Sequence, residues 1–480
     1  MSAECIKNAY DLLGWLCGTI SALSKREQEE LIKQYNPQKR TKVVENSFDW
    51  FCMKGAQKEN DYEFLEESQI EIICKTVIDW MKTDSDRICI LYLLTYVEAY
   101  FDFEKAFKHF LTDQLSERVT MNAWNFVALN SNYKEVKGIL IPKFEPLWKK
   151  NYGHSSMELE ISPFSLLEKY IWIPETIDGW KLLNIYIDDE YIRISKNKPL
   201  KIIASPGQKE VTFCYHCDEN NKFFIDGYDE AACEELENKI ENILESSVEE
   251  QAHILLFPEM IGTKKIVENV CGYLGENDNE YPMLIFLPTT EELISKEKNI
   301  YQNTLCVVDG NGEKLAEYHK QHSFCLEKKN KDTQNMNKYY EPIEEDKHIS
   351  VFHVKGVGRI GVLICADVFS RELKKYLFEK LQINILLVMA FTSGIDSFFR
   401  ALAPAQEAVC DVVWCNTCAA YENHSSDKPV VAYFSYGHKD QSMQAHPCCD
   451  ENSKKCQSCM ITIKIATAYE KAGCLDPCVF

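Results

Sequence analysis

Apolar residues recur at helical spacing along the first third of the chain. The pattern is clearest over residues 9–23, 70–81 and 88–110, where polar residues occupy the opposite face. This spacing places the apolar side chains on one side of a helix, where packing can bury them. Glycine and proline are scarce in this part. We therefore predict an all-helical accessory or interaction domain over residues 1–170.

The pattern changes after residue 170. Prolines and a glycine interrupt residues 171–204, which we interpret as a connecting segment. Within it, residues 182–194 alternate between apolar and polar side chains, and this alternation predicts a short hairpin around residues 188–190.

From about residue 205, apolar runs of strand length alternate with helix-like segments. Helices are expected at residues 229–249, 371–381 and 396–408. Strands are expected at residues 211–215, 254–257, 283–287, 301–308, 314–318, 349–354, 359–364, 383–390, 412–415, 430–435 and 460–465. This alternation, with hairpins included, predicts an α/β layered domain with a mixed sheet over residues 205–480.

Composition and charge narrow the class of protein. With 45% apolar and 26% charged residues, the 480-residue chain is typical of soluble proteins, and no apolar run approaches the roughly 20 residues of a membrane span. The formal net charge of -21 argues against nucleic-acid binding, which depends on basic surfaces. We interpret the lysine-rich residues 328–338 as a solvated loop. The 21 cysteines are scattered and no secretory signal precedes them, so we expect reduced thiols in a cytoplasmic protein.

Three candidate catalytic residues each follow an apolar run. Glu259 comes after residues 254–257, Lys320 after residues 314–318, and Cys365 after the run Gly-Arg-Ile-Gly-Val-Leu-Ile. Taken singly, each has an ordinary explanation as a solvated carboxylate, a surface lysine or a buried structural thiol. A thiol at a strand end beside a helix N-terminus, however, can be both presented and made acidic.

The order of these residues resembles the nitrilase (carbon–nitrogen hydrolase) superfamily over about residues 205–470. The resemblance implies a layered α-β-β-α catalytic domain. It also implies that Cys365 attacks an amide or nitrile carbon to form a thioester, and that Glu259 serves as general base. Lys320 would stabilise the oxyanion, together with a backbone N–H near Ala366.

Many members of the family use a second glutamate before the cysteine. Glu341 suits that position and would orient Lys320 and the substrate, with Glu327 and Glu344 as rivals. Two further positions bear on the substrate, and both are candidate substrate-binding residues. Ala366 stands where the family often has an aromatic residue, which leaves more room beside the thioester. Asn416 resembles an asparagine that the family often places at a strand end, where it could hold the structure or contact the substrate.

A cysteine cluster near the C-terminus has spacing compatible with a metal site. Cys448, Cys449, Cys456 and Cys459 could together bind a structural zinc ion. The alternative is a flexible loop with reduced thiols. Chemistry of the nitrilase type needs no metal, and no cofactor is expected for catalysis.

The sequence therefore predicts a carbon–nitrogen hydrolase. We expect it to be an amidase that acts on a small amide substrate. The resemblance suggests a homo-oligomer. Two alternatives share the same residues. The domain could be a scaffolding module that docks a partner protein through the helical domain, or an N-acyltransferase that passes the acyl group to an amine.

Overall fold

The computed structural model describes residues within 12–48, 67–100, 138–142, 170–187 and 192–465. Shorter gaps inside these ranges are residues 14, 17–18, 21–22, 175, 178, 194–198, 209–210, 278, 296, 298, 330–334, 355–356, 409, 422–428, 438–441 and 447–458. The chain divides into two compact units, of which the second takes up nearly everything from Gly179 onward. Within the described residues, no helix is both long enough and apolar enough to cross a membrane.

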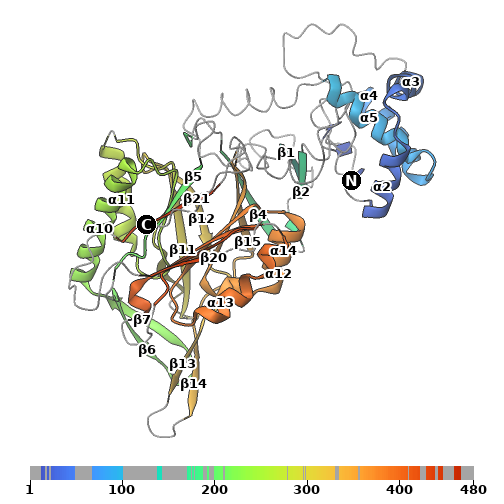
Figure 1. Cartoon of the computed structure of the whole chain (residues 1–480). Helices are drawn as coiled ribbons and strands as arrows, with labels where there is room; N and C mark the ends of the chain where they lie inside the picture. The colour runs from blue at the N-terminus through green and yellow to red at the C-terminus, as the bar shows by residue number, and fades with distance from the viewer. Residues whose placement is uncertain are drawn as a thin grey trace. The chain divides into compact units, whose positions relative to one another are not determined.

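In its described residues, the first unit contains helices and the strand pair β1–β2 (Figure 1). The helices are α2 (Lys25–Gln34), the 3-10 helix η2 (Pro37–Lys39), α3 (Arg40–Ser47), α4 (Glu67–Lys82) and α5 (Arg87–Tyr100). Strand β1 (Gly138–Pro142) pairs antiparallel with β2 (Tyr170–Pro174). The helices bury apolar residues at helical spacing, such as Ile73 and Val77 of α4.

Helices form among the residues described up to 100, but the part before residue 175 is not all helix. Strands β1 and β2 carry the short runs Ile-Leu-Ile and Ile-Trp-Ile. Such runs are too short for a helix and are rich in β-branched and aromatic residues, which favour strands. Residues 101–110, expected to continue the helix α5, lie outside the described residues.

The second unit holds two mixed sheets. The first sheet has the strand order β10-β11-β9-β8-β5-β21, and β12 also pairs with β11. Its strands are β5 (Leu200–Ala204), β8 (Ile254–Leu256), β9 (Leu284–Phe286), β10 (Thr290–Ser295), β11 (Ile300–Val308), β12 (Lys314–His319) and β21 (Ile461–Ile465). Strands β5, β8 and β9 run parallel, and the others join antiparallel.

The second sheet includes the strand order β20-β19-β18-β17-β16-β15-β4. Its strands are β4 (Trp180–Ile187), β15 (His348–Val354), β16 (Gly358–Ile364), β17 (Ile385–Ala390), β18 (Asp411–Asn416), β19 (Ala432–Ser435) and β20 (Ser442–Ala445), and the short β3 (Thr176–Ile177) precedes them. Strand β4, the first arm of the hairpin predicted at 182–194, pairs in parallel with β15. Residues 188–191 and 194 of that prediction lie outside the described residues.

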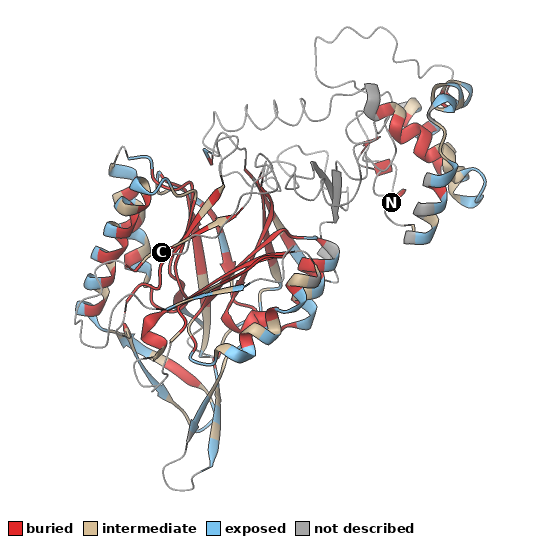
Figure 2. Cartoon of the chain, viewed as in Figure 1, coloured by how far each residue is buried: buried red, intermediate tan, exposed pale blue. Residues whose placement is uncertain are grey.

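The two sheets pack face to face, and helices cover their outer faces (Figures 1 and 2). Between the sheets, the rings of Phe286 and Phe352 lie 5.5 Å apart. Helices α10 (Glu230–Glu249) and α11 (Lys264–Glu276) bury their apolar faces against the first sheet. On the second sheet, Phe398 of α13 (Ile395–Leu402) contacts Trp414 of β18. The mixed α/β prediction is therefore confirmed.

Local chemistry explains where these helices begin. The Asp229 side chain accepts a hydrogen bond from the Ala232 N–H at the start of α10, and Thr263 caps α11 in the same way. The remaining helices are the 3-10 helices η3 (Cys365–Phe369) and η5 (Cys418–Tyr421), the short α12 (Arg371–Lys374) and α14 (Pro404–Glu407), and the π-helix η4 (Lys375–Lys380). The segment predicted as one helix at 371–381 is thus α12 followed by η4.

Two hairpins extend from the same end of the sheets (Figure 1). One is formed by β6 (Phe213–Cys217) and β7 (Phe223–Tyr228), and the other by β13 (Cys325–Lys329) and β14 (Met336–Tyr340). The Tyr340 N–H donates a 2.8 Å hydrogen bond to the Asn221 carbonyl, so the hairpins are joined through their backbones. The lysine-rich segment expected to be a solvated loop is in part this second hairpin.

Candidate active site

The four residues proposed for catalysis each follow a strand end, and the fold brings them to one place. Glu259 lies just beyond β8, Lys320 directly after β12, Glu341 directly after β14, and Cys365 directly after β16. All four are at most 2% exposed. Because the two sheets face each other, the ends of β8 and β12 meet the end of β16.

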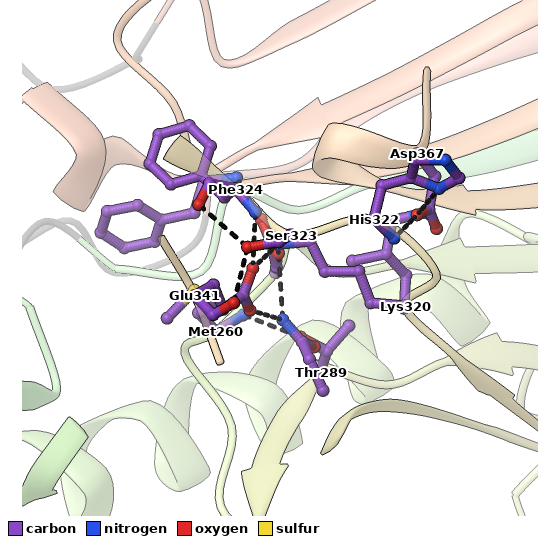
Figure 3. A network of polar contacts seen from close by, with 12 residues as sticks. Met260, Thr289, Lys320, His322, Ser323, Phe324, Glu341 and Asp367 are labelled. Carbon is purple, nitrogen blue, oxygen red and sulfur yellow. Dashed lines mark hydrogen bonds and ion pairs between the residues drawn. The ribbon is translucent and has the colours of Figure 1, made fainter. Parts of the chain in front are cut away.

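Lys320 joins two buried carboxylates (Figure 3). Its Nζ donates a hydrogen bond of 2.6 Å to Oε1 of Glu259 and another to Oε2 of Glu341. The two rival glutamates are exposed, and Glu327 pairs instead with Lys338. The structure therefore brings Glu341, rather than either rival, to the lysine.

Asn303 fixes both carboxylates and was missed by sequence reasoning. Its Nδ2 donates to Oε1 of Glu259 at 3.0 Å and to Oε1 of Glu341 at 3.2 Å. The sequence pattern that could have identified it is a polar residue within strand β11, on the same face as the buried Leu305 and Val307. A buried amide on an apolar face must find partners, and here the partners belong to the site.

Cys365 begins the 3-10 helix η3 and has a strained backbone. Its φ of 43° lies in the left-handed region, which costs a non-glycine residue about 1–3 kcal/mol. The Glu259 carboxylate and the backbone N–H of Phe391 lie near enough to the thiol to act on its pKa. This sharp turn at the strand end directs the sulfur toward the base.

Burial opposes the acidity expected for a thiol at a helix N-terminus. Burial raises the pKa of the Cys365 thiol well above its usual value, and the negative charge of Glu259 raises it further. The Lys320 ammonium opposes these effects but does not overcome them. The thiol is therefore protonated at rest, and its activation depends on a base.

Burial also sets the charge on the other two groups. Desolvation raises the pKa of Glu259, and the Glu341 carboxylate adds to this effect, whereas Lys320 lowers it. For Lys320, burial alone would lower the pKa, but Glu259 and Glu341 outweigh it and raise the pKa well above normal. The site thus holds a stable ammonium beside a carboxylate of increased basicity.

Asp367 connects the loop of the lysine to the turn of the cysteine (Figure 3). Its buried carboxylate accepts hydrogen bonds from the Tyr318 hydroxyl at 2.9 Å and from the backbone N–H groups of Gln321 and His322 at 2.9 and 2.8 Å. It also accepts from the Ile364 N–H at 3.2 Å. One carboxylate thereby positions both chain segments.

A further buried carboxylate, Glu291 in β10, was also missed. It lies directly opposite Asn303 in the register of β10 and β11, which places both side chains on one face. Neither of its oxygens has a hydrogen-bond partner among the described residues. Burial first, and then the Glu341 charge, raise its pKa to about 8.

A cavity of about 210 Å³ opens beside Glu259 and Lys320. The residues that line it are mostly apolar: Val211, Phe213, Tyr215, Phe223, Met260, Phe324, Leu326, Phe391, Ala419 and Ala420, with the polar Thr392 and Ser393. The two candidate substrate-binding residues, Ala366 and Asn416, are buried and do not line the cavity. Asn416 exchanges two hydrogen bonds with the backbone of Thr392, and in this way it holds the loop that does.

The predicted zinc cluster falls largely outside the described residues. Only Cys459 is described, and it is buried. Within the part of the chain that the structure describes, histidine, cysteine, aspartate and glutamate side chains form no group that could hold a metal ion. The zinc site stays a prediction.

Comparison with known proteins agrees with this arrangement. Residues 230–419, which include all four candidate catalytic residues, match the family model described as carbon-nitrogen hydrolase. Residues 230–419 are therefore similar to the carbon–nitrogen hydrolase (nitrilase) superfamily.

One curated protein and two solved structures are similar to parts of this chain. The deaminated glutathione amidase of Synechocystis sp. is 32% identical over 117 residues, which cover 23% of this chain and 41% of the relative. The chain thus spans less than half the length of that curated relative. An amidase from Nesterenkonia sp. is 13% identical with a TM-score of 0.37, over 57% of this chain and 94% of the amidase. A mutant of that amidase in complex with butyramide is 14% identical, over 57% of this chain and 93% of that one, with the same TM-score.

Proposed function

We propose that this carbon–nitrogen hydrolase is an amidase that acts through a thioester on Cys365. The observation that carries the proposal is the buried Glu259–Lys320–Glu341 group with the Cys365 thiol in contact with its base. A deeply buried ion pair is costly to maintain, and it is placed beside a strained cysteine and an open cavity.

The first half of the reaction forms the thioester. Glu259 takes the proton of the Cys365 thiol as the sulfur attacks the amide carbon. Because burial raises the pKa of Glu259, Glu259 can keep this proton until it passes to the leaving nitrogen. The carbonyl oxygen becomes negative and is stabilised by the Lys320 ammonium, which is already in place and needs no rearrangement. Glu259 then protonates the leaving nitrogen, and the C–N bond breaks.

The second half releases the acid. Glu259 removes a proton from water, which attacks the thioester carbon, and the thiolate leaves and regains a proton from Glu259. The sum is amide plus water giving carboxylic acid plus amine or ammonia. Glu341 and Asn303 take no part in these transfers. They hold the side chains of Lys320 and Glu259 in position through the hydrogen bonds described above.

The test is ammonia release from a panel of amides that includes glutamine, carbamoyl amino acids and ω-amides. We expect turnover by the wild type and none by Cys365→Ala, with circular dichroism unchanged because the thiol has no structural partner to lose beyond the site. Mass spectrometry of quenched reactions should show an acyl adduct on the wild type. Turnover retained by Cys365→Ala would refute the mechanism.

A further inference from the structure

The aromatic side chains that line the cavity beside Lys320 come from three separate segments. The hairpin β6–β7 contributes Phe213, Tyr215 and Phe223, and the chain leading into and along β13 contributes Phe324 and Leu326. Phe391 comes from the loop after β17. These segments are far apart in sequence, and each brings aromatic or aliphatic side chains to the same space.

The aromatic side chains pack against one another across the segments. The ring centroids of Phe213 and Phe391 are 5.5 Å apart, and those of Phe223 and Phe324 are 6.4 Å apart, edge to face. Aromatic pairs at such distances stabilise each other beyond simple burial. The backbone hydrogen bond from Tyr340 to Asn221 connects the two hairpins. The cavity wall is therefore formed before a ligand arrives.

The cation at the cavity is already paired with carboxylates. Among the described residues that line it, the charged ones are Glu259 and Lys320, and Lys320 pairs with both Glu259 and the buried Glu341. A substrate carboxylate in the cavity would lose its hydration without gaining a counter-ion, which is strongly unfavourable. An apolar group would instead exchange water for aromatic surface.

One cation lies near the cavity, and its placement does not change this conclusion. Lys328 is exposed, and its Nζ lies 4.9 Å from the centroid of the Tyr215 ring. It therefore stands over the aromatic face of a lining residue rather than among the lining residues themselves.

We infer that the substrates of this site are amides with an uncharged, apolar acyl group of about the size of a phenyl ring. This inference rests on the proposed function for the reaction and adds the class of acyl group. The size follows from the volume. A cavity of roughly 150 Å³ lined by leucine, isoleucine and phenylalanine takes up benzene, so about 210 Å³ accommodates such a group. This class of amides excludes substrates that carry a carboxylate on the acyl chain.

The decisive comparison uses two acyl chains that match in carbon number. Hexanamide ends in a methyl group, and the monoamide of adipic acid ends in a carboxylate. We expect kcat/KM of the wild type to favour hexanamide by at least about 30-fold. Along the series propanamide, butanamide, pentanamide and hexanamide, kcat/KM should rise about fourfold per methylene. A preference for the adipic monoamide would overturn the inference while leaving the proposed amidase function intact.

Binding supplies a readout that does not depend on turnover. The Cys365→Ala protein should bind hexanamide more tightly than the adipic monoamide by a similar factor, measured by ligand-observed NMR titration. Equal or reversed affinities would overturn the inference even where no amide is hydrolysed. Absence of turnover with this binding preference intact would count against the proposed function alone.

Adding a positive charge to the cavity wall tests whether the cavity sets the preference for hexanamide. Leu326→Lys places an ammonium in the cavity wall and should lower the hexanamide preference at least about tenfold. Met336→Lys is the matched control, because it makes the same kind of change on the exposed strand β14, outside the lining residues. The control should leave the ratio unchanged, and an equal shift in both variants would contradict the assignment of the cavity.

Discussion

Replacing Glu291 by glutamine should make the protein more stable at neutral pH and not at pH 5. Glu291 is 8% exposed, and neither carboxylate oxygen has a hydrogen-bond partner among the described residues. Burial, reinforced by Glu341 and Glu259 and opposed by Lys320, raises its pKa from the ordinary 4.5 to about 8. The folded protein therefore keeps a proton on Glu291 at pH values where the unfolded chain has lost it.

The sign and size of the effect follow from this difference in proton binding. The favourable contribution of the protonated side chain is complete below pH 4.5 and is lost as the pH rises through about 8. Each pKa unit corresponds to about 1.4 kcal/mol, so raising the pH from 5 to 7 should cost the wild type about 2.5 kcal/mol of unfolding free energy through this group. Glutamine is neutral throughout and should escape this loss.

Urea unfolding of the wild type and Glu291→Gln at pH 5, 6, 7 and 8 measures the difference in unfolding free energy between the two proteins. Other titrating groups are common to both proteins, so their contributions cancel in this difference. We expect the variant to gain about 2.5 kcal/mol relative to the wild type between pH 5 and pH 7. Glu292→Gln serves as the control, because the side chain of Glu292 is exposed. A flat difference for Glu291→Gln would refute the argument that burial holds the proton.

Two further substitutions test the positioning of the cysteine. Asp367→Asn should lower both the thermal midpoint and kcat, because an amide cannot accept all the hydrogen bonds of the carboxylate; an unchanged kcat would contradict its positioning role. Gly358→Ala should lower the free energy of unfolding by about 2 kcal/mol or more, because φ is +118° and a Cβ would lie 2.3 Å from Oδ1 of Asn384. Urea titration tests this, with Gly272→Ala in α11 as the control: its Cβ meets nothing within 4 Å, and it should stabilise by about 1 kcal/mol. Equal effects of the two alanines would refute the steric argument.

Much of the second unit could be predicted from the sequence because its elements have strong local patterns. The helix expected at 229–249 is α10, and the strands before Glu259, Lys320 and Cys365 are β8, β12 and β16. Predictions were weaker where the local pattern was short or polar. The strand pair β1–β2 was missed because each strand is only five residues long, and the hairpin β13–β14 was missed because its residues are largely charged and polar.

The contacts of the site were less predictable than its residues. Asn303 and Glu291 appeared as ordinary polar residues of strands, and their importance follows from cross-strand register and from burial against the other carboxylates. Asn416 could be read from the sequence as a ligand contact or a structural residue. Its hydrogen bonds with the Thr392 backbone decide which atoms it faces.

The sequence by itself determined the resemblance to carbon–nitrogen hydrolases and the order Glu259, Lys320, Cys365, since each residue follows a strand whose apolar pattern is local. Only the tertiary structure decided that Glu341 joins Lys320, that the Cys365 thiol stays protonated at rest, and that an aromatic cavity adjoins them. The physical reason is that burial, charge coupling and cavity shape depend on segments far apart in the chain. Those segments meet only when two sheets and two hairpins have packed together.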